Sequence, residues 1–127
     1  MSELKPAVKA KIDKVFAQQK VYALELRKSD YRQRLAVLKR FEVAFRASYD
    51  KIHKSAGADF GKPAAEVDMA EIMPVLTELK HIRKQLKEWM KPEPVKSTLS
   101  MMGTQSKIVK EPKGVTLVVS PWNYPFN

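Results

Sequence analysis

The sequence predicts an α/β chain in which helices come first and extended segments follow. Two observations lead to this fold class. Apolar residues recur every three or four positions between Pro6 and Met90, which is the period of helices that bury one face. After Pro94 this period is lost, and an apolar run from Val115 to Val119, interrupted only by Thr116, is typical of a strand buried on both faces.

The first helix is predicted over Pro6 to about Leu26, where apolar residues fall at mostly helical intervals between lysines. Its apolar positions are Val8, Ile12, Val15, Phe16 and Tyr22. Ser29 or Asp30 can cap the next helix, because a short side-chain oxygen there accepts a hydrogen bond from the free amides of the first turn. A second amphipathic helix is therefore expected to begin directly after these residues.

Two further apolar stripes predict a long second helix that ends near Gly57 and a third helix that begins at Pro63. The second stripe consists of Tyr31, Leu35, Leu38, Phe41, Phe45, Tyr49 and Ile52. The third consists of Ile72, Val75, Leu76, Leu79, Ile82, Leu86, Trp89 and Met90. Pro74 lies inside the third stripe and should kink or split that helix, because proline removes a backbone hydrogen bond.

Short strands are predicted over Lys96–Met102 and Ser106–Glu111, with residues 103–105 as the turn of a hairpin. The last strand candidate is Val115–Ser120. A parallel strand needs a crossover and a partner strand, and these residues supply neither.

Composition excludes several classes of protein. The chain has 127 residues, 44% of them hydrophobic, and no cysteine, so neither a disulfide framework nor a thiolate metal site nor a thiol nucleophile exists within it. Its start carries charges where a secretory leader needs an apolar core, and no stretch has the length of a membrane span. We therefore expect a soluble, cytoplasmic chain without a membrane partner.

The formal net charge of +10 raises the question of a nucleic-acid partner. The 24 basic residues are interleaved with 14 acidic ones, and no aromatic residues stand between basic ones for base stacking. This pattern favours a solvated basic face. We expect no nucleic-acid partner, and binding through the helical face is the weaker alternative.

The segment Pro-Trp-Asn-Tyr-Pro, residues 121–125, directly follows the last strand candidate. Ligands of open parallel α/β sheets lie just beyond the carboxyl ends of the strands, so this segment is a candidate site. The residues alone equally allow a core strand followed by a proline-braced turn with a buried tryptophan.

Residues 111–126, EPKGVTLVVSPWNYPF, resemble the first cofactor-domain strand and loop of the aldehyde dehydrogenase superfamily. In that family a Pro-x-Gly lead-in precedes a hydrophobic strand that ends in Pro-Trp-Asn-Tyr/Phe-Pro. Upstream, DFGKPAAEV at residues 59–67, EIMPVL at 71–76 and WMKP at 89–92 look like the N-terminal helices of members similar to the class 3 and coniferyl-aldehyde enzymes. The resemblance runs from roughly residue 8 to the last residue.

The resemblance implies an incomplete aldehyde dehydrogenase fold with a Rossmann-like cofactor domain. Residues 1–94 would be the N-terminal helical segment of that domain, residues 95–112 the hairpin of the oligomerisation arm, and residues 113–127 the first strand and loop of the cofactor domain. The complete enzyme would then be a homo-oligomer.

The resemblance also implies an activity, the oxidation of an aldehyde to a carboxylic acid with NAD or NADP through a cysteine thiohemiacetal. Asn123 matches the catalytic asparagine whose side-chain amide helps to form the oxyanion hole, and that amide offers two N–H donors without a titratable charge. The positions that match the segment along the nicotinamide and its ribose are Val119, Ser120, Pro121 and Trp122. Tyr124 would line the aldehyde entrance, with core packing as the alternative.

In the resembling family the nucleophilic cysteine, the general-base glutamate and the lysine that grips the adenosine ribose all lie downstream of Asn127. We therefore expect the isolated chain to be inactive. The alternative is a non-enzymatic, basic helical module whose terminal strand docks on another protein, for example a dehydrogenase subunit.

His53 and His81 are the two histidines of the sequence, and neither has a carboxylate at metal-ligand spacing. We interpret both as surface or packing residues and predict no metal site. Ser48 and Ser55 near His53 do not make a catalytic triad, because no sequence cue brings a carboxylate to orient the histidine.

Overall fold

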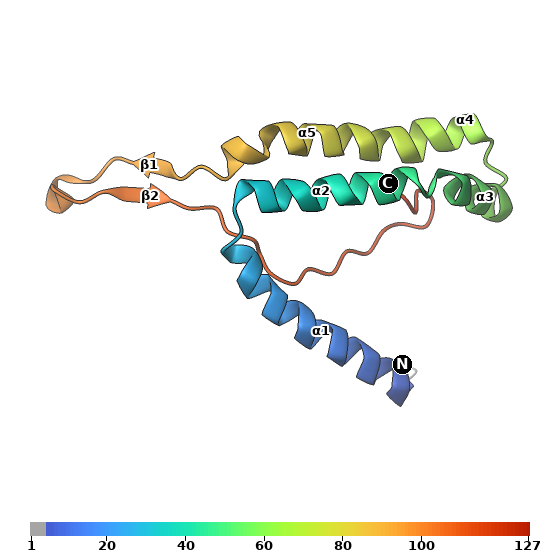
Figure 1. The fold of residues 1–127 in the computed structure, drawn as a ribbon, viewed down its shortest axis with the longest axis horizontal. Helices are drawn as coiled ribbons and strands as arrows, with labels where there is room; N and C mark the ends of the chain where they lie inside the picture. Colours follow the sequence, from blue (N-terminus) through green and yellow to red (C-terminus); the bar gives the residue numbers. More distant parts are fainter. Residues whose placement is uncertain (1–4) are drawn as a thin grey trace.

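The computed structural model describes residues 5–127 as a set of helices with a hairpin projecting from one end (Figure 1). Its elements are α1 (Pro6–Arg27), α2 (Tyr31–Arg46), α3 (Tyr49–Phe60), α4 (Ala64–Val67), a π-helical turn (Asp68–Ile72), α5 (Met73–Trp89), β1 (Glu93–Val95), a 3-10 turn (Leu99–Met101) and β2 (Ser106–Ile108). The charged start that argues against a secretory leader includes residues 1–4, which lie outside the described residues.

Helices α4 and α5 form one rod that runs beside α2, and α3 lies at the end of this pair opposite the hairpin (Figure 1). The core sits where α3, α4 and the π-helical turn meet. Its buried side chains are Ile52, Ala56, Val67 and Ile72, and Phe45, Tyr49 and Leu76 pack against them. The core therefore fixes the connection between α3 and α4, the part of the fold against which the end of the chain packs.

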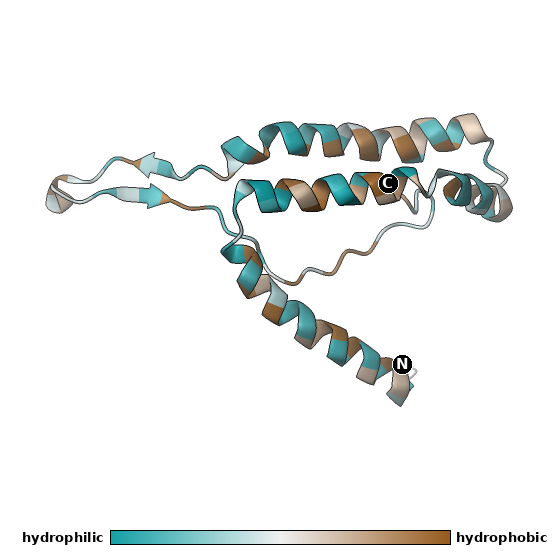
Figure 2. Ribbon diagram, viewed as in Figure 1, coloured by the Kyte–Doolittle hydropathy of each residue, from teal (hydrophilic) through white to brown (hydrophobic). Residues whose placement is uncertain are grey.

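Helix α1 leaves the other helices at an angle and contributes no buried residue (Figure 1). Hydrophobic residues recur along it in Figure 2, and their side chains, such as those of Val8, Ile12 and Phe16, are exposed. Across residues 5–127, no helix has both the length and the apolar character needed to cross a membrane.

Asp30, one of the two predicted candidates, caps α2. Its side chain accepts a hydrogen bond of 2.8 Å from the backbone N–H of Gln33, and the Gln33 side chain accepts one of 2.8 Å from the backbone N–H of Asp30. These reciprocal bonds form a capping box. Ser29 has a different role, because its hydroxyl donates to the carbonyl of Leu26 at the end of α1 and accepts from Arg34.

The prediction of one long helix ending near Gly57 was wrong, because the chain turns after Arg46 and continues as α3. At the break the hydroxyl of Ser48 donates to the carbonyl of Ala44 at 2.9 Å, a local bond that competes with helix continuation. Helix α3 ends at Gly61, whose φ of 66° is in the left-handed region that glycine adopts without strain.

Both prolines of the third helix mark boundaries. Pro63 is the N-cap of α4 rather than its first helical residue. Pro74 lies where the helix type changes, because the π-helical turn ends directly before α5, which carries this proline in its first turn. The rod continues through this point, since Ile72 and Met73 keep right-handed helical backbone angles, so the predicted split does not occur. Proline has no N–H, so Pro74 donates to no carbonyl of the preceding turn.

The hairpin forms by antiparallel pairing of β1 with β2, with Glu93 opposite Ile108 and Val95 opposite Ser106. The predicted first strand, Lys96–Met102, was wrong, because the strand lies earlier and the 3-10 turn falls inside that range. Local bonds explain the shift. Thr104 donates through both its backbone N–H and its hydroxyl to the carbonyl of Met101, and this closes a wide loop instead of extending the ladder.

Residues 115–120 form no strand in the part of the chain that the structure describes. They belong to an extended stretch that returns from β2 past α1 toward the junction of α3 and α4 (Figure 1). The physical reason is the one already apparent from the sequence, since a strand needs a neighbour to bond with. The assignment of residues 113–127 to a cofactor domain, like the boundaries at 94 and 112, stays a prediction.

The small core yields a matched stability test. We expect Ile52→Ala to lower the free energy of unfolding by about 2–5 kcal/mol, because it leaves a cavity at a side chain that is 4% exposed. Ile12→Ala makes the same chemical change on α1 where the residue is 52% exposed, and should change it by less than about 0.5 kcal/mol. Urea unfolding followed by circular dichroism measures both. Equal losses would contradict the assigned core.

Candidate functional site

The candidate site lies where the end of the chain meets the connection between α3 and α4. Lys62 stands in that connection, between the left-handed Gly61 and the N-cap Pro63. Glu71 stands in the π-helical turn. Their side chains form an ion pair of 2.9 Å between the Lys62 Nζ and the Glu71 Oε1 atoms. The site is thus built on two elements that the core holds together.

Among residues 5–127, Glu71 is the charged residue that the fold buries completely, with 0% of its side chain exposed. A buried carboxylate is costly unless both oxygens have partners. Its Oε1 accepts from Lys62, and its Oε2 accepts a hydrogen bond of 3.0 Å from the backbone N–H of Phe126. The carboxylate therefore ties the end of the chain to the helices.

Lys62 is nearly as enclosed, with 11% of its side chain exposed. Besides the bond to Glu71, its ammonium donates at 2.7 Å to the main-chain carbonyl of Asn123. It also lies 4.4 Å from the ring centre of Tyr124 and 5.4 Å from that of Phe60, distances at which an aromatic face attracts a cation. One side chain thus holds the Asn123–Tyr124 segment by charge, hydrogen bond and ring contact.

A third contact holds the last residue. The side-chain amide of Asn127 donates at 3.3 Å to the carbonyl of Ala70 in the π-helical turn. This bond attaches the end of the chain to the same turn that carries Glu71.

The predicted catalytic and substrate-lining residues, Asn123 and Tyr124, lie together beside a hollow of about 350 Å³. Phe60, Gly61, Lys62 and Glu66 form the rest of its lining. In residues 5–127 no hydrogen bond involves the side-chain amide of Asn123, since Lys62 contacts its main-chain carbonyl. The two N–H donors of this amide therefore make no hydrogen bond within the loop.

The four residues predicted to contact a cofactor, Val119, Ser120, Pro121 and Trp122, precede this hollow on an exposed stretch and do not line it. Trp122 is 84% exposed, so the alternative of a buried tryptophan in a proline-braced turn does not describe this structure. Within the described residues, no backbone hydrogen bond engages the main chain of residues 119 and 120, and residues 122–123 form a turn.

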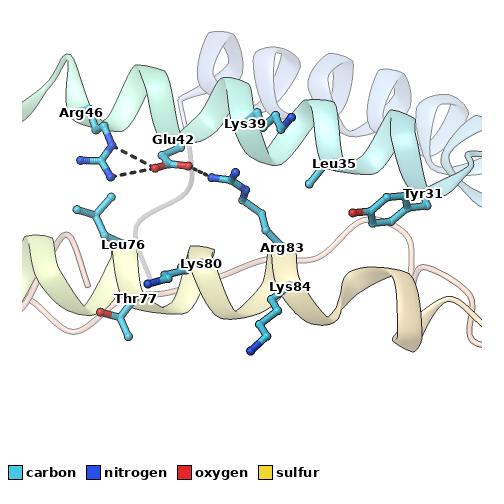
Figure 3. A pocket seen from close by; sticks show the side chains of 10 residues that line it. All are labelled: Tyr31, Leu35, Lys39, Glu42, Arg46, Leu76, Thr77, Lys80, Arg83 and Lys84. Atoms are coloured by element: carbon cyan, nitrogen blue, oxygen red, sulfur yellow. Dashed lines mark hydrogen bonds and ion pairs between the residues drawn. The ribbon is translucent and has the colours of Figure 1, made fainter.

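A second hollow, of about 740 Å³, lies between α2 and α5 and contains none of the predicted site residues (Figure 3). Glu42 of α2 lies in it between two arginines, and it accepts hydrogen bonds of 3.2 and 2.9 Å from Arg46 and a further one from Arg83 of α5. The hydrogen bond from Arg46, opposed by burial and aided by the charge of Arg83, holds the pKa of Glu42 below its ordinary value. This carboxylate ties two helices together.

The structure gives His53 a carboxylate partner that its sequence neighbours did not reveal. The Nε2 atom of His53 lies 2.8 Å from Oδ1 of Asp68, a residue of the π-helical turn. Ser48 bonds to the carbonyl of Ala44 instead, so this pair does not form a catalytic triad. Among residues 5–127, no group of three or more His, Cys, Asp or Glu side chains could hold a metal ion.

The profile of the aldehyde dehydrogenase family matches residues 1–127. The chain belongs to this family. It is 39% identical over 119 residues to the putative aldehyde dehydrogenase AldX of Bacillus subtilis, covering 94% of this chain and 26% of AldX. It is 38% identical over 81 residues to the probable coniferyl aldehyde dehydrogenase of Caulobacter vibrioides, covering 61% of this chain and 17% of that protein.

A class 3 relative and a solved structure agree with this assignment. Aldehyde dehydrogenase family 3 member H1 of Arabidopsis thaliana is 38% identical over 96 residues, which cover 76% of this chain and 20% of that protein. The substrate-bound structure of Staphylococcus aureus AldH superposes with a TM-score of 0.83 at 33% identity, covering 91% of this chain and 25% of that one. The chain thus spans about a quarter or less of these relatives, and the predicted incomplete aldehyde dehydrogenase fold is confirmed.

Sequence reasoning missed Lys62 and Glu71 in this aldehyde dehydrogenase chain. One signal was available for Glu71, which follows Val67 by one helical turn and precedes Val75 by another, so a charge interrupts an apolar face. A charge in that place requires a buried partner. The partner itself could not be read from the sequence, because Lys62 reaches Glu71 only through the turn at Gly61 and Pro63.

Acidification should release the tie between α2 and α5. The pKa of Glu42 is lower in the folded state than in the unfolded state, where it is about 4.3. The Glu42 carboxylate therefore contributes its full stabilisation above about pH 4.3. That stabilisation is lost as the pH falls through the folded-state pKa. A carbon-13 NMR titration of the Glu42 carboxyl should give a midpoint below about 4.3. In Arg46→Met the midpoint should rise toward that value. An unchanged midpoint in this variant would assign the shift to another cause.

Proposed function

We propose that this chain is part of an enzyme that oxidises an aldehyde to a carboxylic acid with NAD or NADP, and that it contributes Asn123 to the oxyanion hole. The observation that supports this role is the placement of Asn123, whose main-chain carbonyl is held at 2.7 Å by Lys62 while its side-chain amide has no hydrogen-bond partner in residues 5–127. A preorganised donor of this kind is what stabilisation of an oxyanion requires.

The chemistry needs a donor at the moment when a thiolate adds to the aldehyde carbonyl. The new carbon–sulfur bond moves an electron pair onto the carbonyl oxygen, which becomes the oxyanion of a cysteine thiohemiacetal. An asparagine amide can donate to this oxygen and carries no charge that titrates near neutral pH. This chain contains no cysteine, so the nucleophile in our proposal comes from sequence outside these residues.

Residues 119–122 are exposed, which fits the proposed cofactor role, and the main chain of residues 119 and 120 takes part in no backbone hydrogen bond within the described residues. Val119, Ser120 and Trp122 can offer N–H and C=O groups to the nicotinamide and its ribose, whereas Pro121 offers only its carbonyl. NAD or NADP held there would supply the hydride acceptor that the oxidation requires. Tyr124, beside the hollow, is placed to contact the aldehyde.

We further propose that the complete enzyme is a cytoplasmic homo-oligomer. The hairpin supports this assembly, because β1 and β2 project from the helices and nearly all their residues are exposed (Figure 1). Exposed backbone at a sheet edge is available for pairing with another chain.

Asn123→Ala in the complete protein should lower kcat by about 10²–10³-fold, because one preorganised oxyanion donor is removed. Formation of NADH or NADPH at saturating aldehyde measures the effect. Gln18→Ala removes an amide from the exposed face of α1 and serves as the control, with unchanged kcat expected. Full turnover of Asn123→Ala would refute the proposed role.

The isolated 127-residue chain should reduce neither NAD nor NADP with any aldehyde, because it lacks a thiol nucleophile. We also expect no measurable affinity for either dinucleotide, since four loop residues supply few contacts. Isothermal titration calorimetry checks the binding, and a dissociation constant in the micromolar range would contradict this expectation.

A further inference from the structure

We propose that Lys62 and Glu71 are positioning residues, which aim the Asn123 side chain by holding the main chain at the Asn123 carbonyl and again at Phe126. This inference rests on the proposed function of Asn123 as an oxyanion donor. Neither residue needs to touch substrate or cofactor to act in this way.

The two partners hold the loop at two points. The Lys62 ammonium donates to the carbonyl of Asn123 at 2.7 Å, and the Glu71 carboxylate accepts from the N–H of Phe126 at 3.0 Å. Fixing the carbonyl of a residue fixes the orientation of its peptide plane. This narrows the range of directions in which the Asn123 amide can point, compared with a loop that is not held at this residue.

The loop has few other constraints. In the described residues, its main chain at 119 and 120 has no backbone hydrogen bond, residues 122–123 form a turn, and Trp122 is exposed. The Asn127 side chain binds Ala70, and the Tyr124 ring rests on the Lys62 ammonium, but both contacts lie after Asn123. The bond from Lys62 is therefore the contact that acts on Asn123 itself.

Charge and burial make this arrangement rigid. Glu71 is fully buried and both of its oxygens have partners, so neither the carboxylate nor the ammonium can swing toward water without leaving an unpaired buried charge. Both residues also flank the core, since Val67 and Ile72 lie between and beside them. The loop thus takes its position from the most tightly packed part of the chain.

A direct role for Lys62 in binding an anionic ligand fits the geometry less well. Two of its three N–H donors are engaged, by Glu71 and by Asn123, and the rings of Phe60 and Tyr124 lie close to the ammonium. Its side chain is 11% exposed. The geometry therefore points to a structural charge that acts through Asn123.

A double-mutant cycle in the complete protein tests the inference. Lys62→Met removes the ammonium but keeps most of the stem, and should lower kcat by about 10- to 100-fold, as expected for a misplaced catalytic group, with the KM for the dinucleotide changed less than about threefold. In the Asn123→Ala background the same change should lower kcat less than about threefold, because the group it positions is already gone. Lys9→Met, which breaks an exposed ion pair on α1, is the matched control and should leave kcat unchanged.

Glu71→Gln provides the second variant if Lys62→Met does not fold. It keeps the shape of the side chain and an acceptor for Phe126 but removes the counter-charge of Lys62. Its loss of kcat should likewise become small in the Asn123→Ala background. A purely structural role predicts equal losses of kcat in the presence and absence of Asn123, and that result, or full turnover of both variants, would overturn the inference. A wild-type protein that reduces neither NAD nor NADP with aldehydes would instead refute the proposed function, and the inference with it.

Discussion

The buried ion pair between Lys62 and Glu71 is the constraint on which the arrangement of the candidate site depends. It joins the connection after α3 to the π-helical turn before α5, and through hydrogen bonds to Asn123 and Phe126 it also holds the end of the chain. A carboxylate with no exposed surface is tolerated only because each oxygen has a donor. The hydrogen bonds that compensate the buried charge of Glu71 therefore also hold the loop in place.

The helices around this pair are shaped by residues that interrupt them. Gly61 ends α3 in a left-handed conformation and directs the chain so that Lys62 turns inward. The π-helical turn that precedes Pro74 presents the carbonyl of Ala70, which accepts a hydrogen bond from the side chain of Asn127. Both interruptions lie beside the small core formed by α3, α4 and the π-helical turn. Local defects in helix geometry thus become attachment points for a segment far away in the sequence.

The carboxylates of Glu42 and Glu71 both join separate elements, but their electrostatic surroundings differ. Glu42 lies between Arg46 and Arg83 at a partly exposed groove, where solvent screens the interaction and moderates its contribution to stability. Glu71 has a single cationic partner and no solvent access. The basic excess of +10 is therefore mostly a property of the solvated faces, while the acidic residues at these two places hold elements together.

The sequence by itself determined the helical period, a cap at Ser29 or Asp30, the interruption at Pro74 and the family, because each depends on residues close together in the chain or on a contiguous motif at residues 111–126. It also placed Asn123 and Tyr124 in one candidate site, whose function remains a proposal. The tertiary structure alone decided the register of β1 with β2 and the partners Lys62, Glu71 and Asp68, because these depend on contacts between residues whose separation along the chain does not predict their distance in space. Residues 115–120 show the limit of local pattern most clearly, since an apolar run becomes a strand only when a neighbouring strand completes its hydrogen bonds.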